Sequence, residues 1–186
     1  MRTIKNKTIY LIGIIVLSFI SIAFIWFQRV GNKIHVNAWA TCPPSIQTEW
    51  VRGRSMEPLI KDKTDILVDY QAYNCGERIR RGDIIIFRNS AVKSSYIKAI
   101  RAIPGDTVTI NNSLGTLTVN DTLLQNSVWE TYYFKKNELN FLSLFVVSWR
   151  LQSDAYFVFG DNTKQSEDSR KIGAISASDI LGKVVK

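Results

Sequence analysis

The chain has 186 residues, of which 46% are hydrophobic and 22% are charged. This composition excludes a largely disordered protein, and the length suits roughly one domain plus an appendage. The formal net charge of +8 indicates an anionic neighbour, either nucleic acid or an anionic lipid surface.

The first predicted element is a transmembrane helix over residues 9–27. This stretch reads IYLIGIIVLSFISIAFIWF and contains no charged residue. As a helix it would measure about 28 Å, close to the thickness of a bilayer core. A cleaved secretory signal is the alternative, because Ala38-Trp39-Ala40 resembles a processing site. That site, however, lies far beyond the end of the apolar run.

Positive charge is heavier before this span than after it. Arg2, Lys5 and Lys7 precede it, whereas Arg29 and Lys33 follow it. The bias predicts a single-pass protein of the plasma membrane with a cytoplasmic N-terminus and an extracytoplasmic body. Anchoring also favours lipid over nucleic acid as the anionic neighbour. The predicted organisation is a cytoplasmic segment 1–8, the span 9–27, a juxtamembrane linker 28–48 and an extracytoplasmic domain 49–186.

The two cysteines, Cys42 and Cys75, both follow the span. They would therefore lie in a compartment where a disulfide can form, but the sequence does not supply the geometry, and both states stay open. With His35 as the single histidine, no structural zinc site is recognisable.

The rest of the chain predicts a mainly β body. Short apolar runs are separated by turn residues, which is typical of strands. The expected strands cover residues 66–70, 83–89, 96–100, 107–110, 116–121 and 156–160. Residues 141–149, FLSLFVVSW, have two interpretations: a buried strand, which is favoured, or an exposed apolar surface that enters the membrane. The aromatic and lysine residues of 129–136 favour the second slightly. No sustained amphipathic helical period is visible after the span.

Lys98 is the residue whose position most suggests chemistry. It interrupts an apolar strand, where alternation places it on one face with Tyr96 and Ile100. Since His35 lies close to the span, a Ser-His-Asp hydrolase is poorly supported. A buried lysine can replace the imidazole as a base if burial keeps its amine neutral. Alone, the pattern also fits an ordinary edge-strand lysine.

Four ordered blocks surround this lysine. They are GRSMEPL at 53–59, RGDIIIF at 81–87, YIKAIRAIPGD at 96–106 and GDNTKQSEDSR at 160–170. In this order and spacing they resemble the signal peptidase I family. The resemblance covers roughly residues 51–110 and 154–184, and the segment between them matches only loosely. It implies a signal-peptidase-like β-barrel or sheet catalytic body with one N-terminal transmembrane helix.

The resemblance also implies the catalytic roles. Ser55 matches the family's nucleophile and Lys98 its general base, together a Ser-Lys dyad. Ser166 matches a serine that orients the lysine. Asp168 and Arg170 match a pair that supports this region.

The oxyanion and substrate sites follow in the same way. The backbone N–H of Ser55, in the Gly53 region, matches the main oxyanion donor. Gly53 itself stands where some relatives have a serine hydroxyl, so a side-chain donor is absent. Met56, Tyr96 and Ile97 match positions of the pocket that accepts small residues before the cut.

The implied function is a serine endopeptidase that removes signal peptides after small-x-small sites such as Ala-x-Ala. No cofactor and no metal are expected. The expected partners are the signal peptides of exported preproteins and the lipid bilayer, with the protein export machinery as a further candidate and no nucleic acid. One alternative is a self-cleaving Ser-Lys repressor, which residues 1–50 do not support because they cannot supply a DNA-binding domain. The other is an inactive, anchored β-rich binding or assembly module on the same scaffold.

Overall fold

The structure is a computed structural model that describes residues 42–89 and 94–185. The predicted span 9–27 lies outside these ranges. Within them, no helix is both long enough and apolar enough to cross a bilayer. The chain divides into two units, Met1–Pro43 and Pro44–Lys186, and the elements described below belong to the second.

The second unit is mainly β, as the sequence predicted. In chain order its elements are β1 (Ile46–Trp50), β2 (Asp65–Asp69), β3 (Ile84–Asn89), β4 (Ser94–Ala102), β5 (Val108–Asn111), β6 (Thr116–Val119), β7 (Thr122–Leu123), α2 (Lys136–Ser143), β8 (Val146–Val147), β9 (Arg150–Leu151), β10 (Phe157–Phe159), α3 (Ser169–Ile172), the 3₁₀ helix η2 (Ala177–Asp179) and β11 (Ile180–Val184). The six predicted strands outside 141–149 correspond to β2, β3, β4, β5, β6 and β10.

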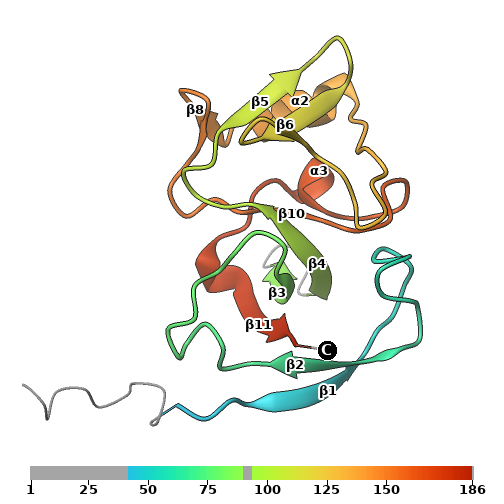
Figure 1. Cartoon of the computed structure of the whole chain (residues 1–186), viewed down its shortest axis with the longest axis vertical. Coiled ribbons are helices and arrows are strands. Elements are labelled where there is room, and N and C mark those ends of the chain that lie inside the picture. The colour runs from blue at the N-terminus through green and yellow to red at the C-terminus, as the bar shows by residue number, and fades with distance from the viewer. Residues whose placement is uncertain (1–41, 90–93, 186) are drawn as a thin grey trace, which may run out of the picture. The chain divides into compact units, whose positions relative to one another are not determined.

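The largest sheet has the strand order β1-β2-β11-β3-β4-β10, and every neighbouring pair is antiparallel. β4 therefore has a partner on each side, with Ile85 of β3 opposite Lys98 and Val158 of β10 opposite Ile100. Figure 1 shows β4 in green beside β3 and β10. The pairing with β10 covers Ala99 to Ala102 and ends just before Lys98, which is paired with Ile85 of β3 and has a buried side chain.

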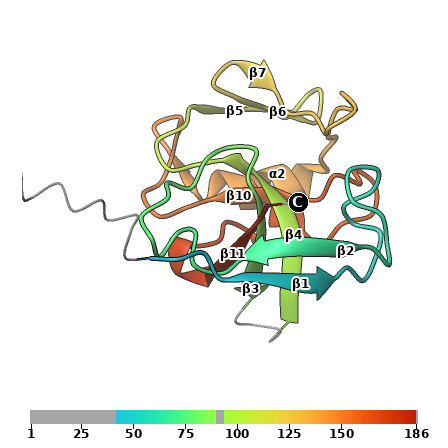
Figure 2. The ribbon, with the colours of Figure 1, turned by 60° about the horizontal axis from the view of Figure 1, so that its bottom comes forward.

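A smaller β layer covers the other end of the body. It consists of the β5-β6-β7 sheet, the β8-β9 hairpin and α2. Figures 1 and 2 both show β5 and β6 at the end away from β1 and β2. Leu117, Leu139 and Phe157 belong to the apolar cluster beneath this layer, and each is at least 99% buried. The two ends are thus joined through β10, whose phenylalanines contribute to this cluster.

Residues 141–149 do not form the buried strand that the sequence favoured. Residues 141–143 end α2, and the rest lies in and around the β8-β9 hairpin. Leu139 and Leu142 are three residues apart and both are buried, so an apolar helical face exists after all. With eight residues, α2 is too short to produce a sustained period. The exposed large apolar side chains of this region are Leu144, Val147 and Trp149.

Cys42 and Cys75, whose state the sequence left open, are both disulfide-bonded. Cys75 lies in the turn after β2, where its N–H donates to the carbonyl of Gln71 at 2.8 Å. Disulfides persist in oxidising compartments.

Candidate active site

The loop between β1 and β2 carries Ser55. Met56 is 1% exposed and packs beneath the loop, while the N–H of Gly53 donates to a carboxylate oxygen of Asp62 at 2.7 Å. From the other side, the N–H of Asn162 donates to the Ser55 carbonyl at 3.0 Å. The buried side chain of Met56 and the hydrogen bond from Asn162 therefore both fix the position of Ser55.

Lys98 reaches Ser55 from the middle of β4. Its Nζ lies 2.9 Å from Ser55 Oγ and donates to the Ile97 carbonyl at 2.8 Å. The side chain is 2% exposed, and the ring of Tyr96 lies 5.6 Å from Nζ. The sequence prediction of a lysine beside Tyr96 on an apolar strand is therefore confirmed in position.

Burial lowers the pKa of Lys98 to about 8 from its ordinary value of 10.5. Desolvation is the largest cause, since it disfavours the charged amine. The nearby carboxylates of Asp168 and Glu167 oppose the shift, and Arg170 adds to it. A sizeable fraction of the amine is consequently neutral at mildly alkaline pH, when it can accept a proton.

Gly160 lies where two loop segments of the site, those of Ser55 and Ser166, come close together. A Cβ on this residue would lie 2.1 Å from Ser166 Oγ and 2.4 Å from the Ser55 carbonyl oxygen. The Gly160 N–H donates to Asp168 at 3.1 Å, and its carbonyl accepts from the Tyr132 hydroxyl at 2.8 Å. Only glycine fits here, because the backbone itself is packed between Ser55 and Ser166.

Ser166 lies beside the dyad with its hydroxyl buried. Within residues 42–89 and 94–185 its Oγ has no hydrogen-bond partner, and it lines the same cleft as Ser55 and Lys98. The Ser55 N–H likewise finds no acceptor in the part of the chain that the structure describes. The Ser55 N–H is therefore available to a bound molecule. The resemblance implies that Ser166 orients Lys98, but in this structure Ser166 Oγ makes no hydrogen bond to Lys98.

Asp168 and Arg170 form a buried ion pair behind the cleft. Arg170 Nε lies 2.8 Å from one carboxylate oxygen and Nη2 lies 2.6 Å from the other. Arg170 also donates to the carbonyl of Thr163, and its guanidinium lies 5.7 Å from the centre of the Tyr132 ring. Asp168 caps α3 by accepting the Arg170 N–H at 3.2 Å. The pair therefore fixes the start of α3 against the segment that carries Ser166.

We expect Asp168→Asn to destabilise the fold by about 3 kcal/mol, because it leaves the buried guanidinium of Arg170 without a counter-ion. Urea unfolding of the full chain in detergent measures this. Asp121→Asn is the matched control, since Asp121 is exposed and asparagine tolerates its positive φ of 61°. Equal unfolding midpoints for the two variants would contradict the structural role of the pair.

An open cleft of about 1060 Å³ runs past the dyad. Of the residues predicted for the substrate pocket, Tyr96 lines the cleft, whereas Met56 and Ile97 are not among the lining residues. Ile97 packs instead against the cluster of Val51 and Ile66. Both residues thus support the wall from behind in this structure. In the part of the chain that the structure describes, no group of three or more side chains forms a metal site.

The opposite wall of the cleft was not found from the sequence. It is built by the segment around residues 130–138, whose aromatic and lysine residues also fit a membrane interface. Its lining residues are Glu130, Thr131, Tyr133, Lys135 and Glu138. Asn162 is a second residue whose role was not predicted. It belongs to the sequence block 160–170, and its side chain donates to the Arg54 carbonyl at 3.2 Å. No spacing signal in a single sequence relates these segments to Ser55.

Comparison with known proteins gives consistent matches. The family model described as "Signal peptidase, peptidase S26" matches residues 6–186. Signal peptidase I U of Bacillus subtilis (strain 168) is 32% identical over 133 residues, which is 71% of this chain and 70% of that protein. Signal peptidase I P of Bacillus subtilis subsp. natto is 34% identical over 139 residues, covering 71% and 70%.

Two further matches come from other bacteria. Signal peptidase IB of Staphylococcus aureus (strain COL) is 30% identical over 144 residues, or 72% of this chain and 73% of that protein. Among solved structures, a signal peptidase I from Enterococcus faecalis V583 aligns with a TM-score of 0.40 and 22% identity, over 59% of this chain and 97% of that chain.

Proposed function

Because the chain belongs to the signal peptidase family, peptidase S26, a family of peptide-bond hydrolases, we propose that it removes signal peptides from exported preproteins with a Ser55-Lys98 dyad. The observation that carries the proposal is the 2.9 Å contact between Lys98 Nζ and Ser55 Oγ, made by a lysine that is 2% exposed. A buried amine of lowered pKa next to a hydroxyl is the arrangement that activates a serine without imidazole.

The proposed reaction begins with proton transfer from Ser55 Oγ to neutral Lys98. The alkoxide attacks the scissile carbonyl carbon, and the Ser55 N–H stabilises the oxyanion that forms. Lys98 then gives its proton to the departing amine, which leaves an acyl-enzyme on Ser55. Water, deprotonated by the same amine, hydrolyses this ester and restores the enzyme. We expect the Ser166 hydroxyl, which has no partner among the described residues, to orient the lysine during the reaction, and the Asp168-Arg170 pair to support the segment on which Ser166 lies.

The substrate proposal rests on the shape of the cleft beside Ser55. Tyr96 forms part of its wall, with the buried Met56 and the partly buried Ile97 supporting the neighbouring segments. Bulk in this wall is expected to favour alanine over a larger side chain at the positions before the cut. We therefore expect cleavage after small-x-small sites such as Ala-x-Ala.

Anchoring by residues 9–27 would hold the catalytic body at the membrane in which signal peptides lie. The proposal rests on the apolar length of that stretch and on the positive charge that precedes it. It includes an extracytoplasmic catalytic body, contact with the bilayer and the export machinery as a candidate partner.

A reconstituted assay tests the function. Full-length protein in lipid vesicles is mixed with a preprotein that has alanine at the first and third positions before the expected cut. A matched preprotein carries phenylalanine at both positions. We expect cleavage of the first alone, at the predicted bond, as read by sequencing the new N-terminus. Failure to cleave either preprotein, or cleavage of both at equal rates, would contradict the proposal.

The pH dependence of the cleavage rate tests the neutral lysine. Because only the unprotonated amine of Lys98 can accept the Ser55 proton, and its pKa is about 8, the rate should rise through that pH and then level off. At pH 7 we expect a rate roughly tenfold below the plateau, since each pH unit below the pKa removes about nine-tenths of the neutral form. A rate that is constant from pH 6 to pH 10 would exclude Lys98 as the base.

A further inference from the structure

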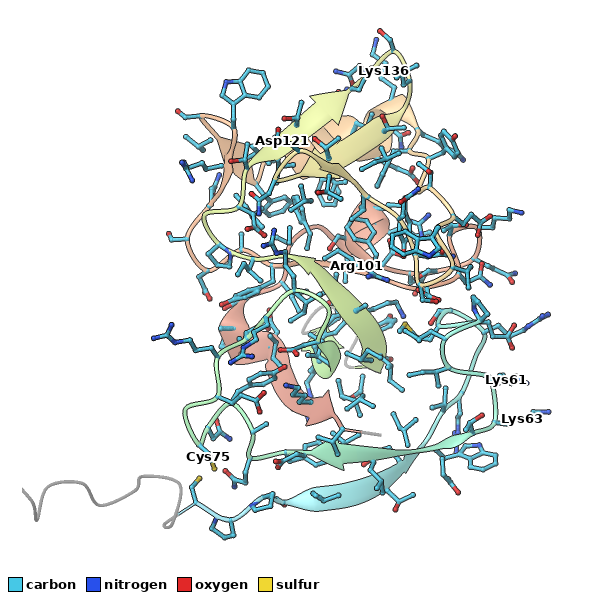
Figure 3. All side chains as sticks on the ribbon, in the orientation of Figure 1. Lys61, Lys63, Cys75, Arg101, Asp121 and Lys136 are labelled. Atoms are coloured by element: carbon cyan, nitrogen blue, oxygen red, sulfur yellow. The ribbon has the colours of Figure 1, made fainter. Side chains whose placement is uncertain are left out.

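Arg101 is a charged residue of β4 to which the reaction above gives no role. It follows Lys98 by three positions, and its Nη2 lies 3.2 Å from a carboxylate oxygen of Asp161. Asp161 is completely buried, and Arg101 is its ion-pair partner among residues 42–89 and 94–185. Figure 3 shows Arg101 in the middle of the body, between the two β layers.

Asp161 is the middle residue of the segment 160–162, which contacts and holds the loop that carries Ser55. The next residue, Asn162, donates from its backbone to the Ser55 carbonyl at 3.0 Å and from its side chain to the Arg54 carbonyl at 3.2 Å. The preceding residue, Gly160, packs directly against Ser55. A shift of Asp161 would therefore move the backbone of Ser55.

The remaining contacts of Asp161 do not replace the arginine. Its carboxylate accepts hydrogen bonds from the N–H of Ser127 at 2.9 Å and from the Ser127 hydroxyl, and its carbonyl accepts from Asn126 at 3.0 Å. These groups are neutral and lie on another loop. Arg101 is thus the contact that joins Asp161 to β4, the strand that also carries Lys98.

We propose that Arg101 is a positioning residue for Ser55. Its ion pair with Asp161 closes a ring of contacts that runs from β4 through Asp161 and Asn162 to Ser55, and back to β4 at Lys98. The ring fixes the separation between nucleophile and base, which come from elements far apart in the chain. The inference rests on the proposed cleavage reaction, and Arg101 itself does not touch the reacting atoms.

A second interaction of Arg101, with Tyr132, also acts on the segment that holds Ser55. Its guanidinium lies close enough to the Tyr132 hydroxyl to oppose the rise in the pKa of that group, which burial raises to about 12. The Tyr132 hydroxyl donates to the Gly160 carbonyl. Arg101 therefore acts on two neighbouring residues of the segment that holds Ser55.

The test compares Arg101→Met with the double variant Arg101→Met/Asp161→Asn. For Arg101→Met we expect kcat to fall about a hundredfold with KM within twofold of wild type, because a small displacement of reacting groups has effects of this size. The double variant no longer buries an unpaired carboxylate, so its unfolding midpoint should return toward wild type. Its kcat should stay low, since the ring of contacts remains open.

Arg81→Met is the matched control. Arg81 also forms an ion pair, with Asp106 at 3.4 Å, but this pair does not involve the segment that holds Ser55. The kcat of Arg81→Met should therefore match that of the wild type. Wild-type kcat in Arg101→Met, or recovery of kcat together with stability in the double variant, would overturn the inference. Should Arg101→Met fail to fold, the double variant alone decides. Loss of cleavage in the wild-type protein would instead refute the proposed function.

Discussion

The Lys98→Met variant is expected to lose cleavage activity and to become more stable at neutral pH. Loss of the base should lower the rate by about a thousandfold or more, because the two members of a dyad act as one unit. Ser55→Ala should lose activity to the same degree. Ser153→Ala, which changes an exposed serine, is the matched control and should cleave normally.

The gain in stability follows from the lowered pKa. Below pH 8 the folded wild type must bury a charged amine, whose pKa falls from 10.5 to about 8, and this costs up to about 3 kcal/mol. Between pH 8 and pH 10.5 the unfolded chain binds more protons than the folded one, so wild-type stability rises with pH there. Methionine has a similar shape without the charge. The advantage of Lys98→Met should therefore be largest below pH 8 and disappear toward pH 10.5.

Urea unfolding of both proteins in detergent, at pH 7 and at pH 10, measures this difference. Lys61→Met controls for the loss of a lysine, because Lys61 is exposed and Figure 3 shows it at the margin of the body, away from Arg101. Lys61→Met should show no difference that depends on pH. A Lys98→Met protein that is less stable than wild type at pH 7 would contradict the buried, partly neutral amine.

The Gly160→Ala variant is expected to reduce kcat by about a hundredfold, the effect of moving reacting groups by roughly 1 Å. The added Cβ would lie 2.1 Å from Ser166 Oγ and 2.4 Å from the Ser55 carbonyl oxygen. Ser166 can rotate away, but a backbone carbonyl cannot move without its loop. The nucleophile should consequently be displaced from Lys98.

Two comparisons separate this steric effect from a general effect of glycine replacement. Gly76→Ala introduces strain at a φ of 88°, but nothing lies within 4 Å of the added atom, so stability should fall slightly while kcat stays unchanged. Removing the Ser166 hydroxyl in Gly160→Ala/Ser166→Ala relieves one contact and leaves the contact with Ser55, so kcat should stay low. Steady-state kinetics of the four proteins measures this, and normal kcat in Gly160→Ala would show that the Ser55 loop adapts.

The sequence predicted well what depends on local pattern. Alternating apolar residues predicted β4. Lys98 interrupts that apolar pattern, and in the structure its side chain is only 2% exposed. The ordered blocks identified the family and brought Ser55, Lys98 and Ser166 to attention, and the structure places all three at one cleft. The local pattern failed at residues 141–149, where α2 is too short for its period to be recognised.

By itself the sequence determined the family, the mainly β class and the residues able to do the chemistry, because strand alternation and short motifs are properties of neighbouring residues. Only the tertiary structure decided which distant segments meet. The contact of Lys98 Nζ with Ser55 Oγ, the packing of Gly160 against Ser55 and the pairing of Arg101 with Asp161 each join residues at least 43 positions apart in the chain. Such contacts depend on how the sheet and its loops pack, and a single sequence contains no periodic signal for them.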